Sequence, residues 1–91
     1  MTDTKKNQPY ETLRDGNLKA TMWLNKSENG AFLSTQYRRT YKDKNGNLQD
    51  TDGLSGIDHL KLARMAELVY TIDRDFRIKQ RELQSEEPEE V

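Results

Sequence analysis

The chain has no cysteine, and its 91 residues include one histidine and two prolines. Without thiols it can form no disulfide, no thiolate nucleophile and no cysteine-based zinc site. His59 has no partners at the spacing of a metal or catalytic site, and no nucleophile–base pair or glycine-rich phosphate loop is visible. We therefore expect a protein that is not an enzyme and that uses no metal, cofactor or small-molecule substrate.

Long apolar runs are also missing. Hydrophobic residues make up 32% of the chain and charged residues 34%. No stretch approaches the roughly 20 apolar residues of a membrane-spanning helix, and the N-terminus lacks the apolar centre of a signal peptide. We expect a cytoplasmic protein without a membrane partner, folded as one small domain with a modest core.

Both ends of the chain differ in composition from the middle. Residues 1–9 are polar without apolar periodicity and are expected to form a flexible lead, and residues 85–91 form an acidic tail that we expect to be disordered. A single domain is predicted over residues 10–84. All 15 basic residues precede the tail, leaving 12 acidic residues against them and a formal charge of +3 for the body. This mild charge permits nucleic-acid binding without requiring it.

Alternating hydrophobicity predicts a β-meander. Leu18–Leu24 places leucine, alanine and methionine side chains on one side and Lys19, Thr21 and Trp23 on the other. Turn signals at Asp15-Gly16, Asn25–Gly30 and Asn45-Gly46 separate four predicted strands, of which this is the second. Those strands are expected at Tyr10–Arg14, Ala31–Tyr41 and Asn47–Leu54.

One register is compatible with all three predicted hairpins. The expected cross-strand partners are Leu13 with Leu18, Met22 with Leu33, Ala20 with Thr35, Leu18 with Tyr37, Tyr37 with Leu54, Arg39 with Asp52, and Tyr41 with Asp50. An Arg39–Asp52 pair would be modestly favourable.

A helix is predicted after the sheet, with Ser55 as N-cap and Asp58 as the acidic residue of the first turn. Its inward positions are Leu62, Met65, Ala66, Val69, Ile72, Asp73 and Phe76. The fold class is therefore α+β: an antiparallel four-stranded β-meander followed by one long C-terminal helix packed on one face. Leu60, Ala63, Leu68 and Tyr70 make the apolar stripe wider than one sheet face requires, so we expect a homodimer through the helix and a strand edge.

The sheet face away from the helix is the candidate binding site. Its predicted nucleic-acid-binding residues are Lys19, Thr21, Trp23, Phe32, Gln36, Arg38 and Lys42, with Ser34, Thr40, Gln49 and Thr51 beside them. Bases stack on aromatic rings for roughly 1–3 kcal/mol each while Lys and Arg follow the phosphates. Single-stranded DNA and RNA are both compatible with these side chains. The alternatives are a protein-interaction adaptor that docks its partner on Trp23 and Phe32, or an outer face that is itself the dimer contact.

The layout resembles a known family of binding domains. The segment Lys-Asp-Lys-Asn-Gly-Asn-Leu (Lys42–Leu48) is similar to a hairpin of the PC4-like single-stranded DNA-binding domains, and Gly53-Leu54-Ser55 leads into an amphipathic helix as in that family. The resemblance covers about residues 10–76 and extends more remotely to the Whirly and Pur-alpha modules. It implies a homodimer that binds unpaired strands on the sheet face away from the helix. The chain also resembles a group of small bacterial or prophage proteins of the same layout.

Overall fold

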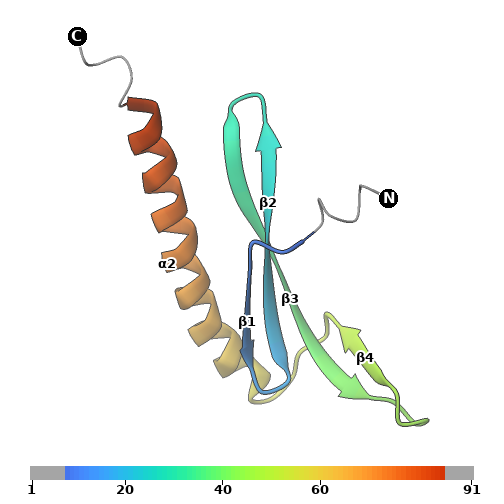
Figure 1. Cartoon of the computed structure of the whole chain (residues 1–91). Helices are drawn as coiled ribbons and strands as arrows, with labels where there is room; N and C mark the ends of the chain where they lie inside the picture. Colours follow the sequence, from blue (N-terminus) through green and yellow to red (C-terminus); the bar gives the residue numbers. More distant parts are fainter. Residues whose placement is uncertain (1–7, 86–91) are drawn as a thin grey trace, which may run out of the picture.

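The computed structural model describes residues 8–85 and consists of a four-stranded antiparallel sheet followed by one helix (Figure 1). The elements are β1 (Glu11–Asp15), β2 (Leu18–Ser27), β3 (Gly30–Lys42), β4 (Leu48–Thr51) and α2 (Asp58–Ser85). The strands lie in the order β1-β2-β3-β4. This confirms the predicted α+β meander. Most of the predicted lead and acidic tail, residues 1–7 and 86–91, lies outside the described residues, and α2 includes Ser85.

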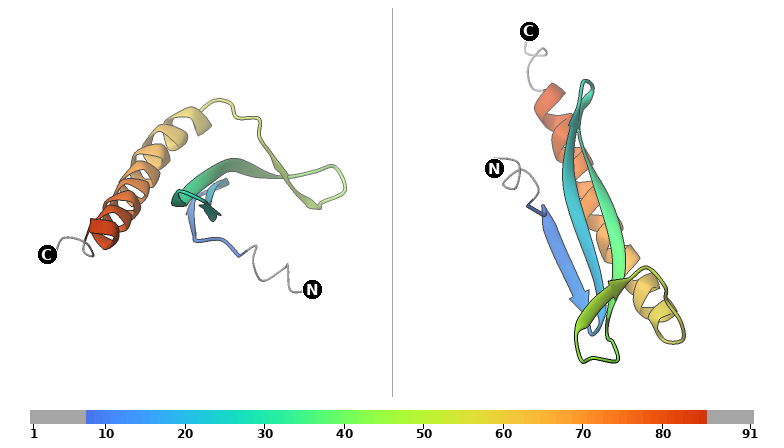
Figure 2. Two further views of the ribbon diagram at one scale, coloured as in Figure 1. Left: turned by 90° about the horizontal axis from the view of Figure 1, so that it is seen from above. Right: turned by 90° about the vertical axis from the view of Figure 1, so that its right-hand side faces the viewer.

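The core lies between β2 and the inner face of α2. Helix α2 runs along one side of the sheet, and no described element covers the opposite side (Figure 2). The alternation of β2 sends Leu18, Ala20 and Met22 towards the helix, where each has no exposed surface. Leu33 joins them from β3, and Met65, Val69 and Phe76 from α2. The predicted inner face of β2 and β3 is thus confirmed, including Tyr37, which packs against this core, although Leu24 near the hairpin tip is 42% exposed.

The first two hairpins differ from the expected register by two residues. Leu13 lies opposite Ala20 instead of Leu18, because the turn is formed by Gly16-Asn17, with Gly16 at a φ of 61°. Met22 lies opposite Thr35 instead of Leu33. Side chains alternate with a period of two, so this shift changes the cross-strand partners but leaves every residue on its expected face.

The third hairpin differs by one residue, and this corrects the predicted face of β4. Arg39 lies opposite Thr51 and Thr40 opposite Asp50, whereas we expected Arg39 with Asp52 and Tyr41 with Asp50. A one-residue slip exchanges the two faces of a strand. Gln49 and Thr51 are therefore on the helix side, and Leu48 and Asp50 are on the open face.

The start of α2 is attached to the sheet by Asp58. Its Oδ2 atom accepts a hydrogen bond from the Ser55 backbone N–H at 3.1 Å and lies 3.2 Å from Nε of Arg39. The predicted acidic residue of the first turn is confirmed, and Arg39 pairs with it instead of with Asp52. The Arg39 Nε–H also donates to the carbonyl oxygen of Gly53 at 3.2 Å, so one guanidinium fixes the connection between β4 and α2.

Candidate functional site

The open face of the sheet carries all seven predicted site residues. Lys19, Thr21 and Trp23 alternate with the buried side chains of β2, and their neighbours on β3 are Arg38, Gln36 and Ser34 respectively. Phe32 and Lys42 lie on the same face at the two ends of β3. The strands therefore bring the predicted residues onto one surface, with the aromatic pair at the hairpin end and the cations at the other.

Polar contacts orient the aromatic end of this face. Trp23 donates its indole N–H to Oε1 of Gln36 at 3.3 Å, and Asn25 Nδ2 donates to Oγ of Ser34 at 2.9 Å. Phe32 lies opposite Asn25 and is 49% exposed. Trp23 and Phe32 thus lie in neighbouring cross-strand pairs of the open face, where each ring offers an apolar surface to a planar group.

The cationic end contains a residue that the prediction missed. Arg14 of β1 lies opposite Lys19 of β2, and Lys19 lies opposite Arg38 of β3. The three cations form one row across three strands, and Arg14 makes no ion pair with another described residue. Leu13 faces the core, so alternation from Leu13 could have placed Arg14 on the open face from sequence.

Acidic side chains partly neutralise that row. Asp50 accepts hydrogen bonds from Nζ of Lys19 at 3.0 Å and from the Thr40 hydroxyl at 2.8 Å. Asp52 forms an ion pair with Arg38, with 3.4 Å between Oδ1 and Nε. The Thr40 hydroxyl and then the Lys19 ammonium hold the pKa of Asp50 below its ordinary value. The one-residue slip of β4 thus brings Asp50, a negative charge that the sequence did not predict there, onto the open face.

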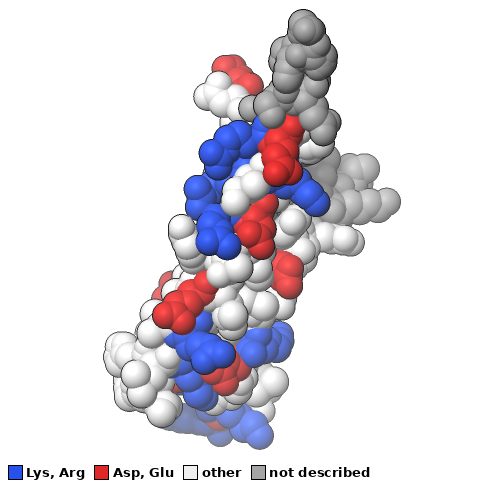
Figure 3. Space-filling model, turned by 90° about the vertical axis from the view of Figure 1, so that its left-hand side faces the viewer, with Lys and Arg blue, Asp and Glu red and all other residues white. Residues whose placement is uncertain are grey.

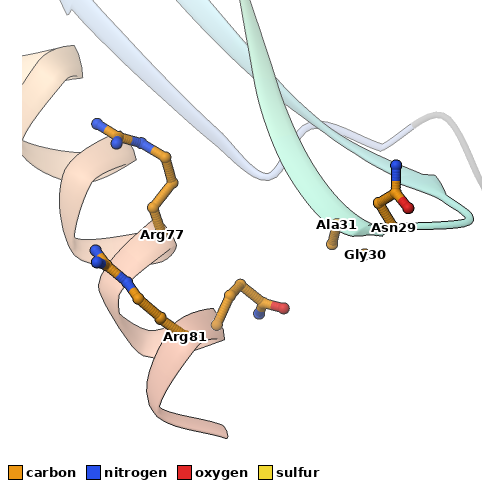
Figure 4. Close-up of a pocket in the computed structure, with 6 residues that line it drawn as sticks. Asn29, Gly30, Ala31, Arg77 and Arg81 are labelled. Carbon is orange, nitrogen blue, oxygen red and sulfur yellow. The ribbon is translucent and has the colours of Figure 1, made fainter. Parts of the chain in front are cut away.

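A hollow of about 400 Å³ between the β2–β3 hairpin tip and the end of α2 is a weaker candidate. It is lined by Asn29, Gly30, Ala31, Arg77, Gln80 and Arg81. Figure 4 shows both guanidinium groups directed away from the hairpin, and Nε of Arg77 lies 3.5 Å from Asp73. The hollow therefore presents little positive charge to a ligand.

The outer side of α2 mixes charges of both signs. Figure 3 shows Lys and Arg side chains interspersed with Asp and Glu over this side of the molecule. Arg74 pairs with Asp75 at 3.6 Å, which illustrates the local balance. Such a surface is typical of a solvated helix and offers no continuous positive patch.

Within residues 8–85, no cluster of three or more His, Asp or Glu side chains is placed to hold a metal ion, and His59 is exposed. Helix α2, the one helix among the described residues, is not apolar enough to cross a bilayer.

Comparison with known proteins found no matching family model, no matching curated protein and no matching solved structure. The open face of the sheet is therefore the surface that indicates a function.

Proposed function

We propose that this protein is a non-enzymatic binding module that holds single-stranded nucleic acid on the open face of its sheet. The observation that carries the proposal is the arrangement of that face: Trp23 and Phe32 at one end and the row of Arg14, Lys19 and Arg38 at the other. Four strand positions separate Trp23 from Lys19, which corresponds to about 13 Å. Bases can stack at one end while phosphates reach the cations at the other.

The ion pairs limit the strength of this binding. Lys19 and Arg38 each have an acidic neighbour, so phosphates must compete with Asp50 and Asp52. Exposed ion pairs are worth only about 0–1 kcal/mol, so a phosphate can displace them. We expect weak, salt-dependent binding without strong sequence preference.

Titration with a fluorescently labelled oligo(dT) at several salt concentrations tests the proposal. Trp23 is the only tryptophan, so its emission reports directly on the face. We expect quenching of Trp23 and a logarithmic affinity that falls linearly with the logarithm of salt concentration, by about 0.7 for each phosphate contacted. Arg14→Ala should reduce that slope by about 0.7, whereas the helix variant Arg74→Ala should leave it unchanged. A salt-independent affinity, or quenching that is absent at saturation, contradicts the proposal.

A protein partner on the same face is the second candidate. The pairing of Lys19 and Arg38 with acids favours it, because less free positive charge remains for phosphates, while Phe32 is still 49% exposed. Such an adaptor would bind its partner at raised salt and leave Trp23 emission unchanged on addition of oligonucleotide. The titration above separates the two functions.

We also propose that the protein is cytoplasmic and forms a homodimer. The described residues include seven buried hydrophobic side chains but eleven large hydrophobic ones that are exposed. Leu60, Leu68 and Tyr70 on α2 are 68%, 47% and 58% exposed. A small domain with this ratio gains stability when a second copy covers part of the apolar surface.

A further inference from the structure

The edge of β3 that faces away from β2 is open over most of its length. β3 spans Gly30–Lys42, but β4 pairs only with Arg39, Thr40, Tyr41 and Lys42. Nine residues, Gly30–Arg38, therefore have no neighbouring strand on that side among the described residues, and Ala31–Tyr37 are the seven between Gly30 at the hairpin tip and Arg38. Long unpaired edges attract further strands, and natural proteins usually shorten, cover or charge them. This segment, Ala-Phe-Leu-Ser-Thr-Gln-Tyr, carries no charge and no proline.

The backbone direction identifies which groups point outward. The N–H of Thr40 donates to the carbonyl oxygen of Asn17, on the β2 side, and the N–H of Asp43 donates to Asn47, on the β4 side. Even-numbered residues of β3 therefore bond to β2, and odd-numbered residues point to the opposite edge. Ala31, Leu33, Thr35 and Tyr37 direct their N–H and C=O groups to the open edge, and within residues 8–85 these groups have no backbone partner outside the sheet.

We propose that a second copy of this chain pairs antiparallel with this edge, with the two-fold axis at Ser34. The open segment ends at the hairpin tip on one side and at the first β4 pair, Arg39, on the other. Pairing centred on Ser34 places Ala31 opposite the second copy's position 37 and Leu33 opposite its position 35. All outward N–H and C=O groups of both copies are then satisfied. A symmetric interface of this kind buries the same patch on each subunit.

Other registers satisfy fewer groups. A centre shifted towards Arg39 would bring the hairpin tip of one copy against β4 of the other, which already occupies that position. A centre shifted towards Gly30 would leave outward groups of Tyr37 unpaired. The neutral segment places no like charges opposite one another, so self-pairing is electrostatically permitted.

The proposed dimer extends the open face, and this part of the inference rests on the proposed function. Trp23 lies opposite Ser34, so the central row of the joined sheet would contain Trp23 and Ser34 from each copy. Phe32 of each copy would flank this row, and the rows containing Arg38 would lie at its two ends. A single strand crossing the axis would meet cations, aromatic rings and cations again.

Cross-linking tests the interface without nucleic acid, so its outcome is independent of the proposed function. Ser34 at the axis would form a non-hydrogen-bonded pair with its copy, with Cα atoms about 4.5 Å apart, within disulfide range. Since the chain has no cysteine, Ser34→Cys introduces a single thiol. Mild oxidation should yield a covalent species of twice the 10.7 kDa chain mass.

Gln36→Cys is the matched control. Gln36 is exposed on the same strand and face, but its distance to its own copy across the axis would be about 13 Å. It should not cross-link alone, yet it should cross-link when mixed with Phe32→Cys, which would lie opposite it. Equal cross-linking of Ser34→Cys and Gln36→Cys, or none with either, overturns the interface.

Amide hydrogen exchange of the unmodified protein provides a second measurement. The outward amides of Leu33, Thr35 and Tyr37 should become protected as protein concentration rises. The amides of Ser34 and Gln36 should be protected at all concentrations because they bond to β2. Outward amides whose exchange is independent of concentration up to the millimolar range would contradict pairing at this edge.

Discussion

Removing the two acids beside the cationic row should strengthen single-strand binding. Asp50 and Asp52 pair with Lys19 and Arg38 at 3.0 and 3.4 Å, and the double variant Asp50→Asn/Asp52→Asn would free both cations for phosphate. The amide oxygen of the asparagine side chain introduced at position 50 can still accept the hydrogen bond from the Thr40 hydroxyl, so this contact between β4 and β3 is retained. The variant therefore alters the charge of the open face with little change in its shape.

The size of the effect follows from the exposure of the pairs. The side chains of Lys19 and Asp50 are 22% and 35% exposed, and those of Arg38 and Asp52 are 40% and 81% exposed. Ion pairs at such exposure are worth about 0.2–1 kcal/mol each. Freeing both should raise affinity about 2- to 30-fold at low salt. Because phosphates no longer compete with a carboxylate for either cation, the salt slope should also steepen, by at most about 1.4 for the two contacts.

Fluorescence anisotropy with labelled oligo(dT) at several salt concentrations measures both quantities. Asp75→Asn is the matched control, because it removes one carboxylate that is paired with an arginine, Arg74, on α2, away from the open face. It should leave the salt slope unchanged. If the double variant binds no more tightly and with the wild-type slope, or if Asp75→Asn produces the same gain, phosphates do not contact Lys19 and Arg38.

Three further predictions concern stability. Met22→Ala, at a side chain with no exposed surface, should lower the free energy of unfolding by about 2–5 kcal/mol in urea titrations followed by circular dichroism, whereas Met22→Leu should cost less than about 1.5 kcal/mol. Asp58→Ala should cost about 1–3 kcal/mol by the same assay because it leaves Arg39 and the Ser55 N–H without their partner; a loss no larger than that of the exposed Asp52→Ala would refute this. Asp43 and Asp50 have lowered pKa values, the first mainly through the Asn47 backbone N–H and the second mainly through the Thr40 hydroxyl. The two ionised carboxylates make their full contribution to folding stability above the ordinary pKa of 3.8, and this contribution is lost as the pH falls through their lower folded pKa values. The free energy of unfolding should therefore decrease on acidification in that range, and Asp50→Asn should flatten the decrease.

The alternation of β2 was sufficient to predict which face of the sheet is buried. Leu18, Ala20 and Met22 are the only residues of that strand whose burial is complete, and they occur at every second position. The partners in the first hairpin were wrong by two residues because Gly16-Asn17, rather than Asp15-Gly16, forms its turn. Those in the second hairpin were wrong by two residues because the strands pair as far as Ser27 and Gly30, which leaves Glu28-Asn29 as the turn. Parity was preserved, so the seven predicted site residues still lie on the open face.

The register of β4 could not be predicted from hydrophobicity because none of its four residues is buried. Local turn chemistry sets it instead. Oδ1 of Asp43 accepts hydrogen bonds from the backbone N–H groups of Asn45 and Asn47, at 2.9 Å each. The backbone N–H of Asp43 donates a hydrogen bond to the Asn47 carbonyl oxygen. These contacts select a three-residue loop with Gly46 at a φ of 85°, where a two-residue turn was expected.

β4 therefore has a larger effect on the binding surface than its size suggests. Because it pairs only with the last four residues of β3, it leaves the edge at Ala31–Tyr37 open. Because its loop is one residue longer than expected, Asp50 faces Lys19 and reduces the positive charge of the open face. A longer β4 would close the edge to a second copy, and a register shifted by one residue would direct Asp50 away from the cationic row. The length of β4 thus sets the proposed assembly, and its register sets the charge of the proposed site.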